Sequence, residues 1–201
     1  MPDPATPPSP PGWLDQHSLP IDPIPAETIL FRVHRQKLAP IFFGPGAGNP
    51  PVFRFDSPSG DYGVMYMGID LESAFVETLL RNPGLRLVSR SEIDLRRWSE
   101  IRVSRELKLA RMHGNGLSAM GATALVNTGG YSGSRAWSHA IWSHPDRLDG
   151  IAYQSKHDTE RKCIALFDRA ATAISLGNGP HAFTLSWVTA TLKQYGKALD
   201  L

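Results

Sequence analysis

The segment YMGIDLESAFVETLL, residues 66–80, joins a predicted strand to a predicted helix. The apolar run Val64–Gly68 is typical of a buried strand. Asp70 then stands where a helix N-cap is expected, and LESAFVETLLR follows until N-P-G ends the helix. One helical stripe contains the apolar and small residues Leu71, Ala74, Phe75, Thr78 and Leu79. Glu77 lies on the flank of this stripe, and a carboxylate so close to a buried face suggests a function.

The residues before this segment predict further strands. In ETILFRVHR, residues Ile29, Phe31 and Val33 alternate with the others, which predicts a half-buried strand with Arg32 and His34 opposite Phe31. The glycines and prolines of FFGPGAGNPP predict a loop, and their spacing does not match a dinucleotide fingerprint. The sequence then predicts a strand over Val52–Phe55 and a turn over DSPSGD.

The downstream segments alternate between the two kinds of structure. LRLVSRSEIDL and IRVSRELKLARM show strand-like alternation, although the second is also compatible with a helix. LSAMGATALV predicts a short helix, and SRAWSHAIWSH a longer one with an apolar stripe of Ala136, Trp137, Ala140 and Ile141. IAYQS and CIALF read as strands, and FTLSWVTATL as a final strand. Without regular βαβ alternation, this order favours one α+β domain over residues 28–201.

The first 27 residues differ in composition from the rest of the chain. MPDPATPPSPPGWLDQHSLPIDPIP is dense in proline, which removes backbone donors, so we expect an extended arm rather than part of a sheet. Two interpretations stay open for this arm. It is a loosely attached tail, or it docks on a second subunit.

Composition limits the class of protein. The chain has 201 residues, 41% hydrophobic and 20% charged, as is typical of a globular domain that buries a core. We see no membrane-spanning run and no secretory signal pattern, so we expect a bacterial cytoplasmic protein. The single cysteine, Cys163, excludes an internal disulfide framework and a cysteine-based zinc site.

The charges are nearly balanced, which argues against direct nucleic-acid binding. There are 21 basic and 19 acidic residues, for a net charge of +2. The arginines at positions 86, 90, 96, 97, 102 and 105 alternate with acidic residues at 92, 94, 100 and 106. We therefore expect a solvated surface with ion pairs there.

Several catalytic signatures are missing. The sequence has neither a phosphate-binding G-x-x-x-x-G-K-S/T loop nor an H-E-x-x-H zinc motif, and its scattered histidines predict no metal site. GGYSGSR resembles a nucleophile elbow but has Ser134 where the motif requires glycine. SKHD holds Ser155, His157 and Asp158 together, whereas the members of a catalytic triad usually come from separate elements.

Five polar residues remain at the margins of the predicted apolar elements: Arg32, Arg54, Tyr66, Glu77 and Ser155. Guanidinium groups match phosphate oxygens, and a tyrosine ring stacks on flat rings. A glutamate holds ribose hydroxyls and stabilises a developing positive charge. The set suits a ligand that carries phosphate and a ring. On spacing alone the alternative is that Arg54 is a surface charge, Tyr66 a core residue and Glu77 a solvated helix residue.

Three longer segments of the sequence resemble those of a known family. LFRVHR, FRFDSPSGDYGVMYMGIDLESAFVETL and DGIAYQSKHD followed by CIALFD resemble the RES-domain toxins of bacterial toxin–antitoxin pairs. The resemblance spans about residues 29 to 168. It implies a fold like that of ADP-ribosyltransferases, with split mixed or antiparallel sheets and flanking helices, and an activity that consumes NAD as a substrate without a metal.

The resemblance also implies roles for the five residues. Arg32 would be the family arginine that binds the pyrophosphate, with Arg54 as a second candidate. Tyr66 would stack near the nicotinamide ring, Glu77 would be the catalytic glutamate at the ribose, and Ser155 would orient the nicotinamide. The segment between Glu77 and Ser155 is longer than in compact family members, which leaves the acceptor of ADP-ribose open.

Three functions stay open at this point. The chain is an NAD glycohydrolase whose acceptor is water, a mono-ADP-ribosyltransferase that modifies a host protein such as phosphoribosyl pyrophosphate synthetase, or a non-catalytic RES-fold module. The resemblance implies a cognate antitoxin as partner, often Xre-like, which would carry the DNA-binding function. A homodimer is a further alternative, suggested by apolar stretches such as AWSHAIW that we expect to be exposed.

Overall fold

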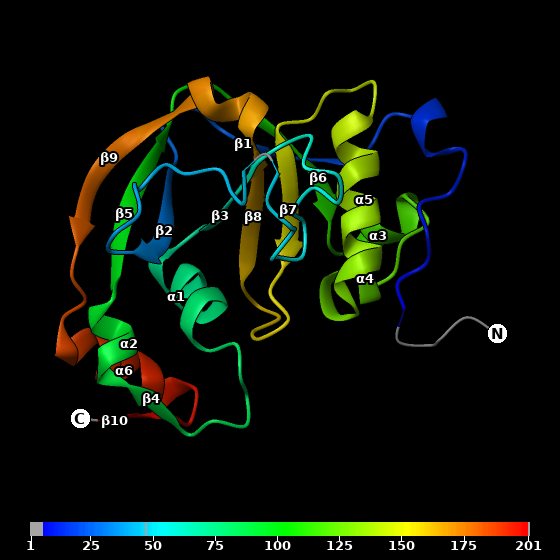
Figure 1. The fold of residues 1–201 in the computed structure, drawn as a ribbon. Helices are drawn as coiled ribbons and strands as arrows, with labels where there is room; N and C mark the ends of the chain where they lie inside the picture. Colours follow the sequence, from blue (N-terminus) through cyan, green and yellow to red (C-terminus); the bar gives the residue numbers. More distant parts are fainter. Residues whose placement is uncertain (1–5, 47, 201) are drawn as a thin grey trace.

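The protein is built around one large mixed sheet (Figure 1). The computed structural model describes residues 6–46 and 48–200. Eight strands form the sheet, in the order β1 (Ile21–Ile24), β6 (Leu107–Met112), β7 (Gly150–Gln154), β8 (Lys162–Phe167), β3 (Val64–Gly68), β2 (Ile29–Arg35), β5 (Arg96–Val103) and β9 (Ile174–His181). Strands β6 and β7 run parallel, and the other neighbours are antiparallel. With its flanking helices, this sheet confirms the predicted α+β class.

The sheet divides between β2 and β3. These two strands share a single paired position, Phe31 with Gly68, whereas β3 and β8 pair along their whole length. One half therefore contains β1, β6, β7, β8 and β3, and the other contains β2, β5 and β9. Figure 1 shows α1 (Leu71–Leu79) lying beside this division. The family resemblance implied split sheets; in the described residues the two halves form one sheet that is joined at this single paired position.

Helix α1 begins as the sequence predicts. The Asp70 carboxylate accepts from the Ser73 backbone N–H at 2.6 Å, and the Ser73 hydroxyl accepts from the Asp70 N–H at 3.2 Å. This reciprocal capping box satisfies two of the free N–H groups at the helix start. Gly68 precedes the turn, and a Cβ atom there would collide with the backbone of the helix. The glycine therefore allows α1 to approach the end of β3 closely.

The two faces of the sheet carry separate apolar clusters. In β8, Cys163, Ala165 and Phe167 belong to one cluster, and Ile164 and Leu166 to the other, as the period of a strand requires. The first cluster packs against α5 (Tyr131–Ser143). Tyr66 and Tyr153 lie on this same side, which is the side that bears the pocket described below.

A third cluster joins α1 to the C-terminal part of the chain. Phe75 and Val76 of α1 pack with Val88 of β4 (Leu87–Ser89) and Ile93 of α2 (Arg90–Asp94). The same cluster includes α6 (Leu185–Gln194), and β4 pairs with β10 (Ala198–Asp200) in a small parallel sheet. The predicted final strand FTLSWVTATL is therefore wrong. The Thr184 side chain caps the helix by accepting from the Trp187 N–H at 3.4 Å.

The predicted strand over Val52–Phe55 is also wrong. The Asp56 carboxylate accepts from the N–H groups of Val52 and Phe53 at 2.8 and 2.6 Å, and the Phe55 N–H donates to the Tyr66 hydroxyl. Side chains thus satisfy the donors that a strand ladder would use, and the segment forms a turn. By contrast, β5 and β6 confirm the strand interpretation of IRVSRELKLARM.

The middle helices differ in detail from the prediction. The segment LSAMGATALV contains the end of α3 (Asn115–Ala119) and the start of α4 (Leu125–Thr128), divided by Gly121 at a φ of 74°. The predicted helix around AWSHAIW is confirmed as α5, but its buried stripe is shifted. Trp137 and Ile141 are fully buried, whereas Ala136 is exposed. The expectation that this stretch is exposed is therefore wrong, and it offers no argument for a dimer.

The proline-rich segment packs against the domain where it is described. Residues 1–5 of the predicted arm lie outside the described residues. The Trp137 indole N–H donates to the Pro8 carbonyl at 2.6 Å, and 3₁₀ helix η1 (Leu14–Gln16) buries Leu14. β1 pairs with β6 and contains Pro23, so the prediction that this segment stays out of the sheet is wrong. An edge strand tolerates proline because one side of it needs no donor.

The arginine-rich surface forms ion pairs, as the charge pattern predicts. Arg90 pairs with Asp94 at 3.3 Å and Arg96 with Glu92 at 3.1 Å.

A second 3₁₀ helix, η2 (Asp168–Ala173), connects β8 to β9. In the described part of the chain, no helix combines the length and apolar character that crossing a membrane requires.

Candidate functional site

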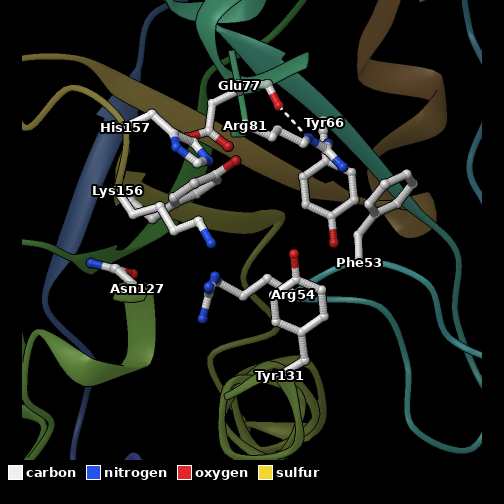
Figure 2. Close-up of a pocket in the computed structure, with 10 residues that line it drawn as sticks. Phe53, Arg54, Tyr66, Glu77, Arg81, Asn127, Tyr131, Lys156 and His157 are labelled. Carbon is white, nitrogen blue, oxygen red and sulfur yellow. Dashed lines mark hydrogen bonds between the residues drawn. The ribbon is translucent and has the colours of Figure 1, made fainter. Parts of the chain in front are cut away.

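A pocket of about 190 Å³ opens on the α5 side of the sheet, next to the end of α1 (Figure 2). Side chains from five elements and three connecting segments meet there. Its lining consists of Phe53, Arg54, Tyr66, Glu77, Arg81, Asn127, Tyr131, Tyr153, Lys156 and His157. Its volume is smaller than the roughly 300–1,000 Å³ of typical ligand pockets. It is therefore sized for a small ligand or for one end of a larger one.

Tyr66 forms one wall of the pocket, and its hydroxyl is used within the protein. The hydroxyl donates to Asp56 Oδ1 at 2.9 Å and accepts from the Phe55 N–H at 2.9 Å. Burial, together with the negative charge of Asp56, raises the pKa of Tyr66 well above its usual range, so it stays a donor. The ring of Phe53 meets the ring of Tyr66 edge-on, with centroids 5.5 Å apart. Tyr66 therefore offers its ring to a ligand and holds the turn that carries Arg54.

Arg54 enters the pocket from this turn. Its Nη1 donates to the carbonyls of Gly129 and Val126 at 2.8 and 3.3 Å and to the Ser134 hydroxyl at 2.9 Å. The guanidinium lies over the Tyr131 ring, 4.8 Å from its centroid. Burial lowers the pKa of Arg54 from its usual range. Because Nη1 is already engaged, Nη2 is the terminal nitrogen left for a ligand.

Glu77 lies across the pocket from Arg54, on α1 (Figure 2). The backbone carbonyl of Glu77 accepts from Arg81 Nε at 2.6 Å, and the Arg81 guanidinium lies 4.8 Å from the centroid of the Phe53 ring. Arg81 Nε thus bonds the backbone of Glu77 and not its carboxylate. Oε1 of that carboxylate is buried and has no hydrogen-bond partner in the protein.

The SKHD segment forms a loop at the pocket and not a catalytic triad. The Ser155 hydroxyl accepts from the N–H groups of His157 and Asp158 at 3.1 and 3.2 Å, so it fixes the loop. The Lys156 and His157 side chains line the pocket. Burial lowers the pKa of His157, while the nearby carboxylate of Glu77 opposes that effect. Burial thus favours the uncharged imidazole at neutral pH.

An ion-pair network holds this loop against α1. The Arg161 guanidinium bonds Asp70 at 3.0 Å, Glu72 at 2.7 Å and Asp158 at 3.4 Å. The Tyr195 hydroxyl is 3.1 Å from Glu72 and 2.7 Å from Asp158. These contacts connect the start of α1, the loop after β7 and the end of α6. They fix Glu77 and His157 relative to each other because each lies on one of the connected segments.

Three buried polar atoms in the pocket have no partner within the protein: Arg54 Nη2, Glu77 Oε1 and Asn127 Oδ1. Buried polar groups are nearly always hydrogen-bonded, so each such atom calls for an explanation. One donor and two acceptors thus belong to side chains that line the same small pocket. A polar ligand that both donates and accepts hydrogen bonds would satisfy all three.

The structure brings together three of the five residues singled out by sequence, namely Arg54, Tyr66 and Glu77. Arg32 and Ser155 do not line this pocket. Arg32 is 8% exposed and donates to the Pro40 carbonyl at 2.6 Å, and burial lowers its pKa to about 10. Ser155 is 1% exposed and caps its own loop. A direct contact of either residue with a ligand stays a prediction.

Sequence reasoning did not single out the remaining lining residues. Lys156 and His157 follow Ser155 directly, so their proximity to the site was available from the sequence. Tyr153 precedes Ser155 by two positions, so the same signal applied to it. Asn127 and Tyr131 gave no such signal, because only the folded chain brings α4 and α5 to the pocket. Among the described residues, no three His, Cys, Asp or Glu side chains are grouped so as to hold a metal ion.

Comparison with known proteins places the chain in a family. The model of the family described as "RES domain" matches residues 29–187. The chain belongs to the RES domain family. The match contains all the strands from β2 to β9 and every residue that lines the pocket. The pocket therefore lies entirely within the part of the chain that matches the RES domain.

The chain is also similar to one named protein and to one solved structure. A Sinorhizobium fredii protein named "Probable toxin y4kH" is 30% identical over 84 residues, which are 41% of this chain and 65% of that protein. The match thus spans just under two thirds of the relative's length. The fold resembles a chain in the crystal structure of the M. tuberculosis MbcT-MbcA toxin-antitoxin complex, with a TM-score of 0.57 and 12% identity. That likeness covers 87% of this chain and 91% of the other, and it concerns the fold.

Proposed function

We propose that this RES domain is a toxin that cleaves the bond between nicotinamide and ribose in NAD. The ADP-ribose would pass to water or to a protein acceptor. One observation carries the proposal: Glu77, whose buried Oε1 has no partner in the protein, lines a pocket together with tyrosine rings and a guanidinium group. The Sinorhizobium relative and the toxin–antitoxin complex favour a toxin rather than a metabolic enzyme.

Glu77 would act on the ribose. Cleavage breaks the bond between ribose C1′ and the ring nitrogen, and the electron pair leaves with nicotinamide. The ribosyl carbon then carries positive charge in an oxocarbenium-like state, as in glycoside cleavage. A carboxylate held close to that carbon stabilises the charge, and its free oxygen accepts from a ribose hydroxyl. Water, or a side chain of another protein, adds to C1′ and releases its proton.

The other residues would position the substrate. The Tyr66 ring provides a flat apolar wall for the nicotinamide. Arg81 and Lys156, both exposed at the pocket, offer positive charge to the phosphates that lie outside the small cavity. The pocket thus fits the nicotinamide end of the substrate, and the adenosine end would extend along the surface.

The proposal includes a protein partner. A cognate antitoxin would protect the producing cell, and an Xre-like antitoxin would also supply the DNA-binding function that this nearly neutral chain does not suggest. Expression of the chain alone should therefore arrest growth. Normal growth of cells that accumulate the wild-type protein without an antitoxin would contradict the toxin assignment.

Nicotinamide release from NAD by the purified protein tests the activity directly. Release in buffer alone would establish water as acceptor. Release, or transfer of labelled ADP-ribose, only with bacterial cell extract would establish a protein acceptor, which mass spectrometry would then identify. If fresh protein free of antitoxin gives neither result, the catalytic proposal is wrong and a non-catalytic RES-fold module takes its place.

A further inference from the structure

Two of the unpartnered atoms in the pocket are a donor and an acceptor held on one side of it. Arg54 is 8% exposed and Asn127 is 5% exposed, so both side chains are more than nine-tenths buried. Arg54 Nη2 has a hydrogen to donate and Asn127 Oδ1 has lone pairs to offer, and neither finds a partner in the protein. A buried donor and a buried acceptor that stay unpaired in the protein indicate a ligand that pairs with both.

The same short helix fixes the direction of both side chains. Asn127 of α4 donates through Nδ2 to the Met112 carbonyl at 2.8 Å, which assigns the amide nitrogen to that contact and leaves Oδ1 for the pocket. Arg54 Nη1 donates to the carbonyls of Val126 and Gly129, on either side of α4's last residues. Figure 2 shows Arg54 and Asn127 on the side of the pocket away from Glu77.

A donor next to an acceptor is the complement of a primary carboxamide. The carboxamide oxygen accepts one hydrogen bond and its NH₂ group donates another. We propose that Arg54 and Asn127 form the subsite that binds the carboxamide of nicotinamide, with Arg54 Nη2 donating to its oxygen and Asn127 Oδ1 accepting from its nitrogen. This inference rests on the proposed function, because it specifies which end of NAD enters the pocket and how that end is selected.

The arrangement of charge agrees with this orientation. Arg54 is positive on one side of the pocket, and Glu77 provides a carboxylate on the other. Before cleavage the pyridinium ring carries a positive charge beside Arg54, and after cleavage the departing nicotinamide is neutral. The positive charge moves to the ribosyl carbon, towards Glu77 and away from Arg54. Fixed charges placed this way favour the transition state over the bound substrate.

The size of the pocket supports a single small ring with its substituent. A volume of about 190 Å³ does not enclose a dinucleotide. An adenine ring also presents a donor beside an acceptor, so adenine is the competing occupant. The electrostatic arrangement favours nicotinamide, because adenine undergoes no change of charge in the reaction and would gain nothing from Glu77.

An analogue that lacks only the amide donor provides the test. In the 3-acetylpyridine analogue of NAD, a methyl group replaces the NH₂ group and the carbonyl oxygen remains. Wild-type protein should cleave NAD with a kcat/KM roughly tenfold or more above that for the analogue, because the analogue leaves Asn127 Oδ1 unpaired. Asn127→Leu should lose this preference and cleave the two substrates with similar kcat/KM.

The ratio of the two substrates separates recognition from folding. A variant that is only poorly folded loses both activities equally and keeps the ratio. Asn178→Leu, at an exposed position on β9, serves as the control and should keep the wild-type ratio. If wild type and Asn127→Leu show the same ratio while nicotinamide is released, the carboxamide subsite is overturned and the proposed function stands.

Calorimetry with free ligands covers the case in which no cleavage occurs. Nicotinamide should bind the wild-type protein at least about tenfold more tightly than 3-acetylpyridine, and Asn127→Leu should remove the difference. That result without any NAD cleavage would support the subsite and reject the proposed enzyme. Adenine displacing nicotinamide from the wild-type protein, or equal binding of the two pyridines, would overturn the subsite.

Discussion

The hydroxyl of Tyr66 should stabilise the turn that carries Arg54, and Tyr66→Phe tests this. The substitution keeps the ring but removes a hydrogen bond to the Asp56 carboxylate and another from the Phe55 N–H. A hydrogen bond to a charged group contributes about 1.5–3 kcal/mol, and an unpaired buried donor costs about 1–3 kcal/mol. Because both contacts share one hydroxyl, we expect a total loss of about 3 kcal/mol in the free energy of unfolding.

Tyr62→Phe is the matched control. Tyr62 is also buried, and its hydroxyl donates at 2.8 Å to the Ser138 hydroxyl, which is uncharged and has its own acceptor in the Phe55 carbonyl. Loss of this bond should cost about 1 kcal/mol. In a chain of this size, these values correspond to falls in Tm of roughly 6–12 °C for Tyr66→Phe and 2–4 °C for Tyr62→Phe.

Urea unfolding followed by tryptophan fluorescence measures both free energies. Activity adds a second readout, since a loosened turn should raise the KM for NAD in Tyr66→Phe while folded Tyr62→Phe keeps the wild-type KM. Equal destabilisation by the two substitutions would refute the reasoning that the Tyr66–Asp56 contact organises the turn. An unchanged KM in Tyr66→Phe would separate the turn from substrate binding.

Two further predictions concern the loop after β7. Ser155→Ala removes the acceptor of two backbone N–H groups, so the free energy of unfolding measured in urea titrations should fall by about 1–2 kcal/mol. The KM for NAD should rise because His157 is displaced. A folded variant with the wild-type KM would contradict this prediction. Because burial lowers the pKa of His157, nicotinamide release should decline only at pH values below the usual pKa range of histidine, when the imidazolium forms and offsets the charge of Glu77. His157→Asn should lack that decline, and an identical pH profile in the variant would assign it to another group.

Local signals in the sequence were sufficient for the centre of the fold. The strand Val64–Gly68, the cap at Asp70 and the flank of the helix that bears Glu77 all lie within a short segment, so period and capping residues determine them. The family resemblance rested on the same segment. For this reason Tyr66 and Glu77 were predicted as site residues, and the structure places both in one pocket.

Long-range contacts explain what the sequence left open. Arg54 enters the pocket because carbonyls more than 70 residues away accept from Nη1, and no local pattern predicts that. Asn127 becomes a pocket residue only when α4 packs beside the turn of Arg54. The mistaken strand at Val52–Phe55 has a similar cause. Its apolar alternation is overridden by Asp56, whose carboxylate takes the backbone donors of the segment.

The β-branched and aromatic residues of FTLSWVTATL explain the other error. These residues favour strands by intrinsic preference, which tertiary packing often overrides. Val188 and Leu192 lie four positions apart and both pack with α1, so a helical arrangement buries them together. The cap at Thr184 was the local signal that could have corrected the prediction.

The central claim is that the carboxylate of Glu77 stabilises positive charge on the ribose of NAD. The measurement that tests it most directly is the rate of nicotinamide release by Glu77→Gln, compared with wild type and with Glu106→Gln at an exposed position. The account predicts a fall in kcat of about 100-fold or more for Glu77→Gln, with intact folding and near-normal NAD binding, and no change for Glu106→Gln. A folded Glu77→Gln variant that releases nicotinamide at the wild-type rate would contradict the account.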